Sequence, residues 1–274
     1  MISLYFFVFI FGAVIGSFLN VVVLRLNTGQ SIVFGQSKCF SCGKKLAWHE
    51  LVPIFSFLAR KGRCGNCKSK ISWQYPAVEI IAGSFFLLVF LKIFNHSSAF
   101  NEFLIGSSLR VLYYWIIFSF LIIIAVYDYR HQIIPNLFVW IFNFLAFAGL
   151  FFNFGHLDLF RISDFGFRIL NLNNLLAGFA LFAFFALLWG ISKGKWMGFG
   201  DAKLALGIGW LLGMAKGVAA VTLAFWIGAI AGILLLYFSK NKYGLKSSIA
   251  FGPFMILGTI ISLFFGEKII SFLF

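Results

Sequence analysis

Charged residues are scarce in this chain of 274 residues, and acidic residues are the scarcest of them. Only 11% of the residues are charged, just 8 are Asp or Glu, and 62% are hydrophobic. A soluble domain carries about 25% charged residues, so this composition excludes a soluble protein. Apolar runs of the length that a helix needs to cross a bilayer, about 20 residues, recur along the chain. The sequence therefore predicts an all-α polytopic membrane protein.

We expect about eight transmembrane helices, some of them short or broken. They are predicted at residues 2–24, 77–94, 109–126, 136–152, 172–191, 202–212, 217–238 and 251–265. The sixth is too short to span a bilayer without help. The first lacks the basic leader of a signal peptide and is too long for one, so we expect it to be retained as a transmembrane helix.

Three regions follow from this pattern. The first transmembrane helix occupies residues 1–25, a small cytoplasmic domain with four cysteines occupies 26–76, and a membrane core occupies 77–274. If the chain begins outside, most of its 22 Lys and Arg residues lie in inner segments, as the positive-inside rule requires. These segments are the loop at 25–70 and the sites of Arg130, Lys193, Lys195, Lys203, Lys240, Lys242 and Lys246.

The formal net charge of +14 is thus mostly a matter of topology, with attraction to anionic lipid head groups in addition. The basic residues are not interleaved with a stacking surface on a soluble face, so nucleic acid is not an expected partner.

Cysteine occurs only in the large inner loop, as two Cys-x2-Cys pairs. The pairs are Cys39 with Cys42 and Cys64 with Cys67. Two such pairs can place four thiolates tetrahedrally around one structural Zn²⁺. Two disulfides are the alternative, but the basic flanks place the loop in the reducing cytoplasm. Because four cysteines complete the coordination shell, His49 is expected to be a surface histidine.

Two of the eight acidic residues stand at the inner ends of predicted helices. Asp128 follows a long apolar run and precedes Pro135, and Asp201 follows the glycine-flanked Phe199. A carboxylate beside hydrocarbon is costly, so each is a candidate functional residue. Each carboxylate also has a purely structural interpretation. Asp128 could form an ion pair with Arg130, and Lys203 could neutralise Asp201.

Two carboxylates held together do not both ionise readily, so one can keep a proton while the other acts as a base. An aspartyl peptidase needs this arrangement, with one Asp activating water and the other donating a hydrogen bond or a proton to the scissile carbonyl. The same residues could instead bind a proton or cation in a transporter. Side-chain chemistry alone leaves both hypotheses open.

Other polar residues have structural interpretations. Asn20 can hydrogen-bond across a helix interface, Arg25 can extend to the membrane surface, and Glu79 suits a helix N-terminus. His131 is expected to contact lipid head groups.

Several motifs in order resemble the bacterial type IV prepilin peptidases, over nearly the whole chain. They are Gly16-Ser17-Phe18-Leu19-Asn20-Val21 with Arg25; the two cysteine pairs around Trp48, Pro53 and Gly62-Arg63; Tyr75-Pro76-x-Val78-Glu79; Asp128 followed by Pro135; Gly198-x-Gly200-Asp201-x-Lys203; and Phe251-Gly252-Pro253. The resemblance implies a catalytic pair, Asp128 and Asp201, and a metal-binding set, Cys39, Cys42, Cys64 and Cys67.

It also implies a function in the bacterial inner membrane. The enzyme would remove the basic leader of type IV prepilins and pseudopilins at the cytoplasmic face, serving type IV pili or type II secretion. It would then methylate the new N-terminus with S-adenosylmethionine. The four-cysteine loop favours the bifunctional enzyme, but the chain has no soluble methyltransferase fingerprint, so a peptidase without methyltransferase activity is an alternative.

Overall fold

The computed structural model describes residues 2–94, 103–152, 172–238 and 249–273. Within these ranges the regular structure is helical, and the β-type pairing is limited to two isolated bridges in the cysteine loop. The basic residues Lys240, Lys242 and Lys246 lie outside the described residues.

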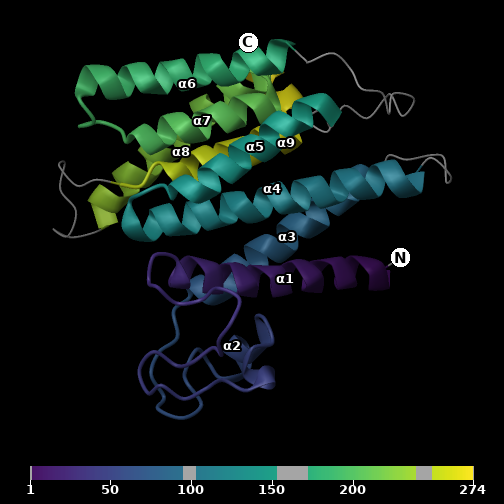
Figure 1. Ribbon diagram of the computed structural model, residues 1–274, viewed down its shortest axis with the longest axis vertical. Coiled ribbons are helices and arrows are strands. Elements are labelled where there is room, and N and C mark those ends of the chain that lie inside the picture. Colours follow the sequence, from purple (N-terminus) through teal and green to yellow (C-terminus); the bar gives the residue numbers. More distant parts are fainter. Residues whose placement is uncertain (1, 95–102, 153–171, 239–248, 274) are drawn as a thin grey trace. The chain divides into compact units, whose positions relative to one another are not determined.

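Each of the eight predicted spans coincides with a helix, which confirms the all-α membrane architecture (Figure 1). The helices are α1 (Ile2–Arg25), α3 (Gln74–Phe94), α4 (Phe103–His131), α5 (Asn136–Phe152), α6 (Leu172–Ser192), α7 (Phe199–Leu212), α8 (Met214–Phe238) and α9 (Gly252–Leu273). Six are long and apolar enough to cross a membrane: α1, α3, α4, α6, α8 and α9. The others, α5 and α7, are the short helices that the sequence predicts.

The chain folds into two compact units, residues 1–123 and 124–274. The first unit contains α1, the cysteine loop, α3 and most of α4. The second contains the end of α4 and the helices α5 to α9.

In the first unit, α1 packs closely against α3. A β-carbon at Gly12, Gly16 or Gly83 would lie within 3 Å of atoms of the facing helix, so glycine permits this approach. The Asn20 amide donates to the backbone oxygen of Tyr75 and accepts a hydrogen bond from the Gln74 amide, each at 3.3 Å. The predicted role of Asn20 in helix packing is confirmed.

The cysteine loop connects α1 to α3 and contains the short helices η1 (Trp48–Glu50) and α2 (Phe55–Ala59). Arg25, at the end of α1, donates to the backbone oxygens of Ser31 (2.7 Å), Phe34 and Gln36. This side chain therefore organises the start of the loop, a role that its predicted reach to the membrane surface did not include.

In the second unit, α7 is the central helix, and Figure 1 shows it between α5 and α6. It also packs against α8 and α9. Ten of its 14 residues are buried, and its Gly209 meets the backbone of Gly178 on α6. A helix of this length spans about 21 Å, less than the bilayer core of about 30 Å. Surrounding it with other helices removes the need for it to face lipid along its whole length.

Candidate functional site

Asp128 lies in the last turn of α4 and is 4% exposed. Its Oδ2 accepts a hydrogen bond of 3.0 Å from the backbone N–H of Gly252, the first residue of α9. The first N–H groups of a helix have no partner within the helix and carry a positive partial charge. The start of α9 therefore supplies Asp128 with a donor from a segment 124 residues further along the chain.

Glycine at position 252 makes this contact possible. A β-carbon built on Gly252 would lie 2.6 Å from the Asp128 Oδ2, closer than the two atoms can pack. Pro253, the next residue, fits because a helix N-terminus leaves its missing N–H without consequence. The Gly-Pro sequence thus creates a helix start that a carboxylate can approach.

Asp201 lies in the first turn of α7 and is 7% exposed. Its Oδ2 accepts a hydrogen bond of 3.2 Å from the backbone N–H of Gly198, the residue that precedes the helix. A side chain at the third helical position commonly returns to the cap in this way. Asp201 therefore fixes the start of its own helix while its carboxylate stays buried.

Three contacts hold the start of α7 against the segment that follows Asp128. Gly200 packs on Ile134, where a β-carbon would come within 2.9 Å. The Lys203 ammonium donates to the Asn136 Oδ1 at 2.9 Å, and Asn143 donates to the Lys203 backbone oxygen at 3.0 Å. Since Pro135 ends the turn between α4 and α5, these contacts place Asp201 near Asp128.

Each carboxylate is buried and accepts a hydrogen bond from one backbone N–H, and no hydrogen bond within 3.5 Å joins the two side chains. In the described part of the chain, no basic side chain forms an ion pair with either of them. Arg130 does not pair with Asp128, and Lys203 is bound to Asn136 instead of Asp201. Two buried carboxylates without a cation to neutralise them are costly to ionise together, which favours protonation of at least one of them.

The cysteine loop gathers its four thiols into a second candidate site. All four Sγ atoms lie within 4.8 Å of one another, and those of Cys39 and Cys67 are 3.8 Å apart. A tetrahedral Zn²⁺ with Zn–S bonds of about 2.3 Å separates its ligands by about 3.8 Å. The cluster can therefore hold a metal ion, while His49 is exposed and outside it, as predicted.

The two cysteine pairs have the same backbone structure. In each, the first Cys donates its N–H across the turn, Cys39 to Lys44 and Cys64 to Ser69, at 2.9 Å. In each, the residue after the second Cys is in the left-handed region, with φ 70° at Gly43 and 60° at Lys68. We call each of these turns a knuckle, the first at 38–45 and the second at 63–70. This repeat presents two thiols from each knuckle to one centre.

Backbone N–H groups prepare one of these thiols for metal binding. Donors from Cys42 and Ser41 lower the pKa of Cys39 to about 6. The Ser69 hydroxyl and backbone N–H likewise lower the pKa of Cys67. A lower pKa favours the thiolate, which is the form that binds a metal.

Sequence reasoning missed the partner of Glu79. This buried carboxylate accepts a 2.7 Å hydrogen bond from the N–H of Ile54 in the cysteine loop. Ile54 has φ 61° and ψ −53°, and Phe55 donates back to the oxygen of Pro53, which defines a γ-turn that is strained for a β-branched residue. In the sequence, Pro53 was the only signal for a turn before Ile54, and it did not indicate that the Ile54 N–H would bind Glu79.

The fold and these two sites define a helical multi-pass membrane protein with a buried aspartate pair and a four-cysteine cluster. Residues 10–93 match the model of the bacterial peptidase A24 N-terminal domain, and residues 115–233 match that of the type IV leader peptidase family. A prepilin leader peptidase/N-methyltransferase of Bacillus subtilis is 32% identical, covering 96% of this chain and 95% of the relative. The chain belongs to the type IV leader peptidase family.

Relatives with the same description occur in other bacteria. The protein of Pseudomonas aeruginosa is 27% identical, covering 94% of this chain and 89% of its own length. That of Vibrio cholerae is also 27% identical, covering 92% of each chain. No solved structure matches the chain.

Proposed function

We propose that this protein is a membrane aspartyl peptidase that removes the basic leader from type IV prepilins and pseudopilins, and then methylates the new N-terminus. The observation that carries the peptidase assignment is the burial of Asp128 and Asp201 at helix ends that pack near each other, with no neutralising cation among the described residues. Membership of the leader peptidase family, and relatives described as peptidase and methyltransferase, support the substrate class and the second activity.

In the proposed reaction, the ionised aspartate removes a proton from a water molecule, whose oxygen attacks the scissile carbonyl carbon. The protonated aspartate donates a hydrogen bond to the carbonyl oxygen as negative charge develops there. Collapse of the tetrahedral intermediate breaks the C–N bond, and a proton passes to the leaving amine. The Gly252 and Gly198 N–H groups hold the two side chains in place throughout.

We assign Cys39, Cys42, Cys64 and Cys67 to a structural Zn²⁺, because four thiolates leave no coordination position for a substrate. The metal would join the two knuckles of a loop that has little apolar core of its own. S-adenosylmethionine is the proposed methyl donor. Its binding residues are not assigned.

The proposed location is the bacterial inner membrane, with the N-terminus outside and the aspartates at the cytoplasmic face. The division into a first helix at 1–25, a zinc domain at 26–76 and a peptidase core at 77–274 is part of the proposal.

The test is incubation of purified protein with a prepilin, in detergent and without any ion gradient. Wild type should shorten the substrate by the mass of its leader, and add a methyl group only when S-adenosylmethionine is present. Asp128→Asn and Asp201→Asn should abolish cleavage, since neither amide can accept a proton from water. Glu267→Gln, at a side chain that is 81% exposed, is the matched control and should cleave normally.

Each outcome separates the hypotheses. Cleavage by either aspartate variant at the wild-type rate would remove the pair from the mechanism. Cleavage without methylation would leave a peptidase alone. A folded wild type that leaves several prepilins intact would favour a transporter that uses the same carboxylates.

A further inference from the structure

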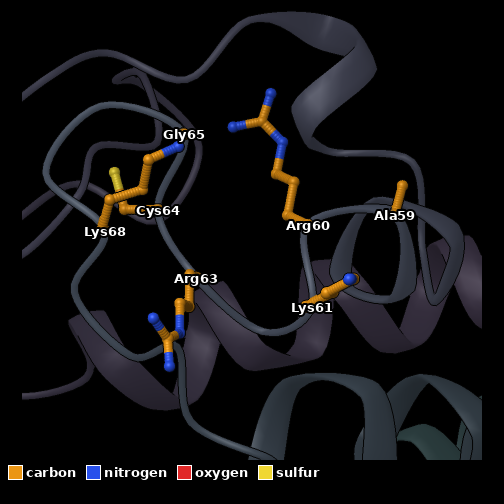
Figure 2. Close-up of a pocket in the computed structure, with 7 residues that line it drawn as sticks. All are labelled: Ala59, Arg60, Lys61, Arg63, Cys64, Gly65 and Lys68. Carbon is orange, nitrogen blue, oxygen red and sulfur yellow. The ribbon is translucent and has the colours of Figure 1, made fainter.

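The cysteine loop contains a hollow with a volume of about 590 Å³ (Figure 2). It is lined by Ala59, Arg60, Lys61, Arg63, Cys64, Gly65 and Lys68. Four of these seven residues are cationic and none is acidic. In Figure 2 Lys68 extends toward Gly65 on one side and Arg60 lies on the other, while the Arg63 guanidinium points away from both. Such a lining is complementary to a compact anion.

An ion pair holds Arg60, and tight turns set the points from which Lys61 and Lys68 extend. The Arg60 guanidinium pairs with Glu50 and passes over Gly65, where a β-carbon would overlap it. Lys68 occupies the left-handed position of the second knuckle, and its N–H donates to the Cys64 oxygen at 3.1 Å. Lys61 is also left-handed, with φ 51°. The cations of the hollow therefore extend from tight turns.

The positive charge here is not balanced within the loop. Glu50 is the only acidic residue between positions 26 and 73, and it already pairs with Arg60 and Lys44. Lys61, Arg63 and Lys68 are exposed, and no carboxylate among the described residues pairs with them. Bringing several cations to one hollow without a counterion raises the potential there and favours an external anion.

The position of the loop indicates the source of that anion. The end of α1 and the start of α3 lie side by side, joined by the hydrogen bond from Asn20 to the Tyr75 oxygen. Both ends of the loop therefore enter the membrane at the same place, which keeps the loop beside lipid head groups. Its aromatic side chains Phe34, Phe40, Trp48 and Trp73 are 73–80% exposed, and Trp is typical of membrane interfaces.

We propose that the hollow binds the phosphate group of an anionic membrane lipid and so docks the cysteine loop on the bilayer surface. Free phosphate shares this chemistry, but the tether gives lipid head groups the higher local concentration. No aromatic residue lines the hollow, so it offers no stacking surface for a nucleotide base.

The test uses the full-length protein and counts bound phosphatidylglycerol by native mass spectrometry during a lipid titration. Arg63→Gln/Lys68→Gln removes two charges from the hollow. The matched control, Lys38→Gln/Lys45→Gln, removes two charges from the bridged positions of the first knuckle, outside the hollow. We expect the first variant to bind about fivefold more weakly for each charge removed, and the control to bind as wild type.

Zinc content is measured on each variant to verify that the loop is intact, and single variants replace any double variant that loses the metal. Equal lipid binding by wild type and the Arg63/Lys68 variants would overturn the proposal. An equal loss in the control would also overturn it, because attraction would then be non-specific. Displacement of the lipid by millimolar inorganic phosphate would assign the hollow to a soluble anion.

Discussion

At the scale of single residues, Gly252 determines how closely a helix terminus approaches the Asp128 carboxylate. The residue contributes its N–H as the donor and the absence of a side chain as the space. These contributions can be separated, because alanine keeps the N–H and removes the space.

We predict that Gly252→Ala lowers the rate of prepilin cleavage about 100-fold, since displacement of a catalytic group by about 1 Å has an effect of this size. Gly190→Ala is the control. A β-carbon at position 190 would meet no atom within 4 Å, and Ala is more favourable than Gly in a helix. The control variant should therefore fold and cleave as wild type does. Initial rates at matched protein amounts measure the effect, and equal rates for both variants would contradict it.

Glu79 acts at the same scale in the other unit. It accepts the N–H of Ile54 at 2.7 Å. One buried carboxylate therefore joins α3 to the cysteine loop. The prediction that Glu79 benefits from a helix N-terminus was wrong, because α3 begins at Gln74 and its first turn contains no acidic residue.

We predict that Glu79→Ala exposes the γ-turn at Ile54 to local opening. An unsatisfied donor costs about 1–3 kcal/mol, which corresponds to at least a severalfold faster amide exchange at Ile54 and Phe55. Glu79→Gln keeps an acceptor oxygen and should preserve most of the protection. Hydrogen exchange read by mass spectrometry on residues 50–58 compares the three proteins. Unchanged exchange in the alanine variant would refute the link.

At the scale of elements, the two knuckles form one unit only when their four thiols share a ligand. They are separated by 17 residues, and the longest described helix between them is α2, with its 5 residues. A metal ion is therefore the main connection between them.

We predict that Cys39→Ser/Cys42→Ser reduces bound zinc from one atom per chain to none, while His49→Ala leaves it unchanged because that side chain is outside the cluster. Elemental analysis of the purified proteins measures the content. Wild-type protein without zinc would contradict the assignment.

Acidification should release the metal. The pKa of Cys39 is lowered to about 6, below the ordinary value of about 8.5. A lowered pKa contributes stability that is complete above the ordinary value and is lost as the pH falls through the folded value. We predict that zinc is retained at neutral pH and released on acidification, because protons compete with the metal for the four thiolates, measured with a chromophoric chelator. Release of zinc only when the pH is raised above neutral would contradict this prediction.

At the scale of the whole molecule, the short helix α7 decides the number of membrane crossings. If α7 crosses, the chain crosses eight times and both termini lie on the same side. Its neighbours α5, α6, α8 and α9 surround it, so a length of about 21 Å is compatible with a crossing inside the protein.

We predict that alkaline phosphatase fused to the C-terminus is active, as required for an outside terminus, while a fluorescent protein fused there is dark. The control is fusion after Lys195, ahead of α7, where the two reporters should behave in the opposite way. A fluorescent C-terminal fusion would show an odd number of crossings and reverse the assignment for α7 or α5.

Sequence alone was sufficient for the positions of the helices and for the cysteine cluster. Hydropathy over about 20 residues locates a transmembrane helix because lipid requires every backbone group to be satisfied within the segment. The spacing of Cys39, Cys42, Cys64 and Cys67 predicted a four-thiol cluster for a similar local reason. Each tight turn places its own two thiols, so little remains for distant contacts to decide.

Tertiary structure alone decided which groups contact the aspartates and Glu79. The helices are apolar around their whole circumference, so their pattern does not indicate which side faces a neighbour. The contacts Asp128–Gly252 and Glu79–Ile54 join residues 124 and 25 positions apart. They depend on the rotation and depth of packed helices, which are set by close contacts at glycines such as Gly16 and Gly200 and not by hydropathy.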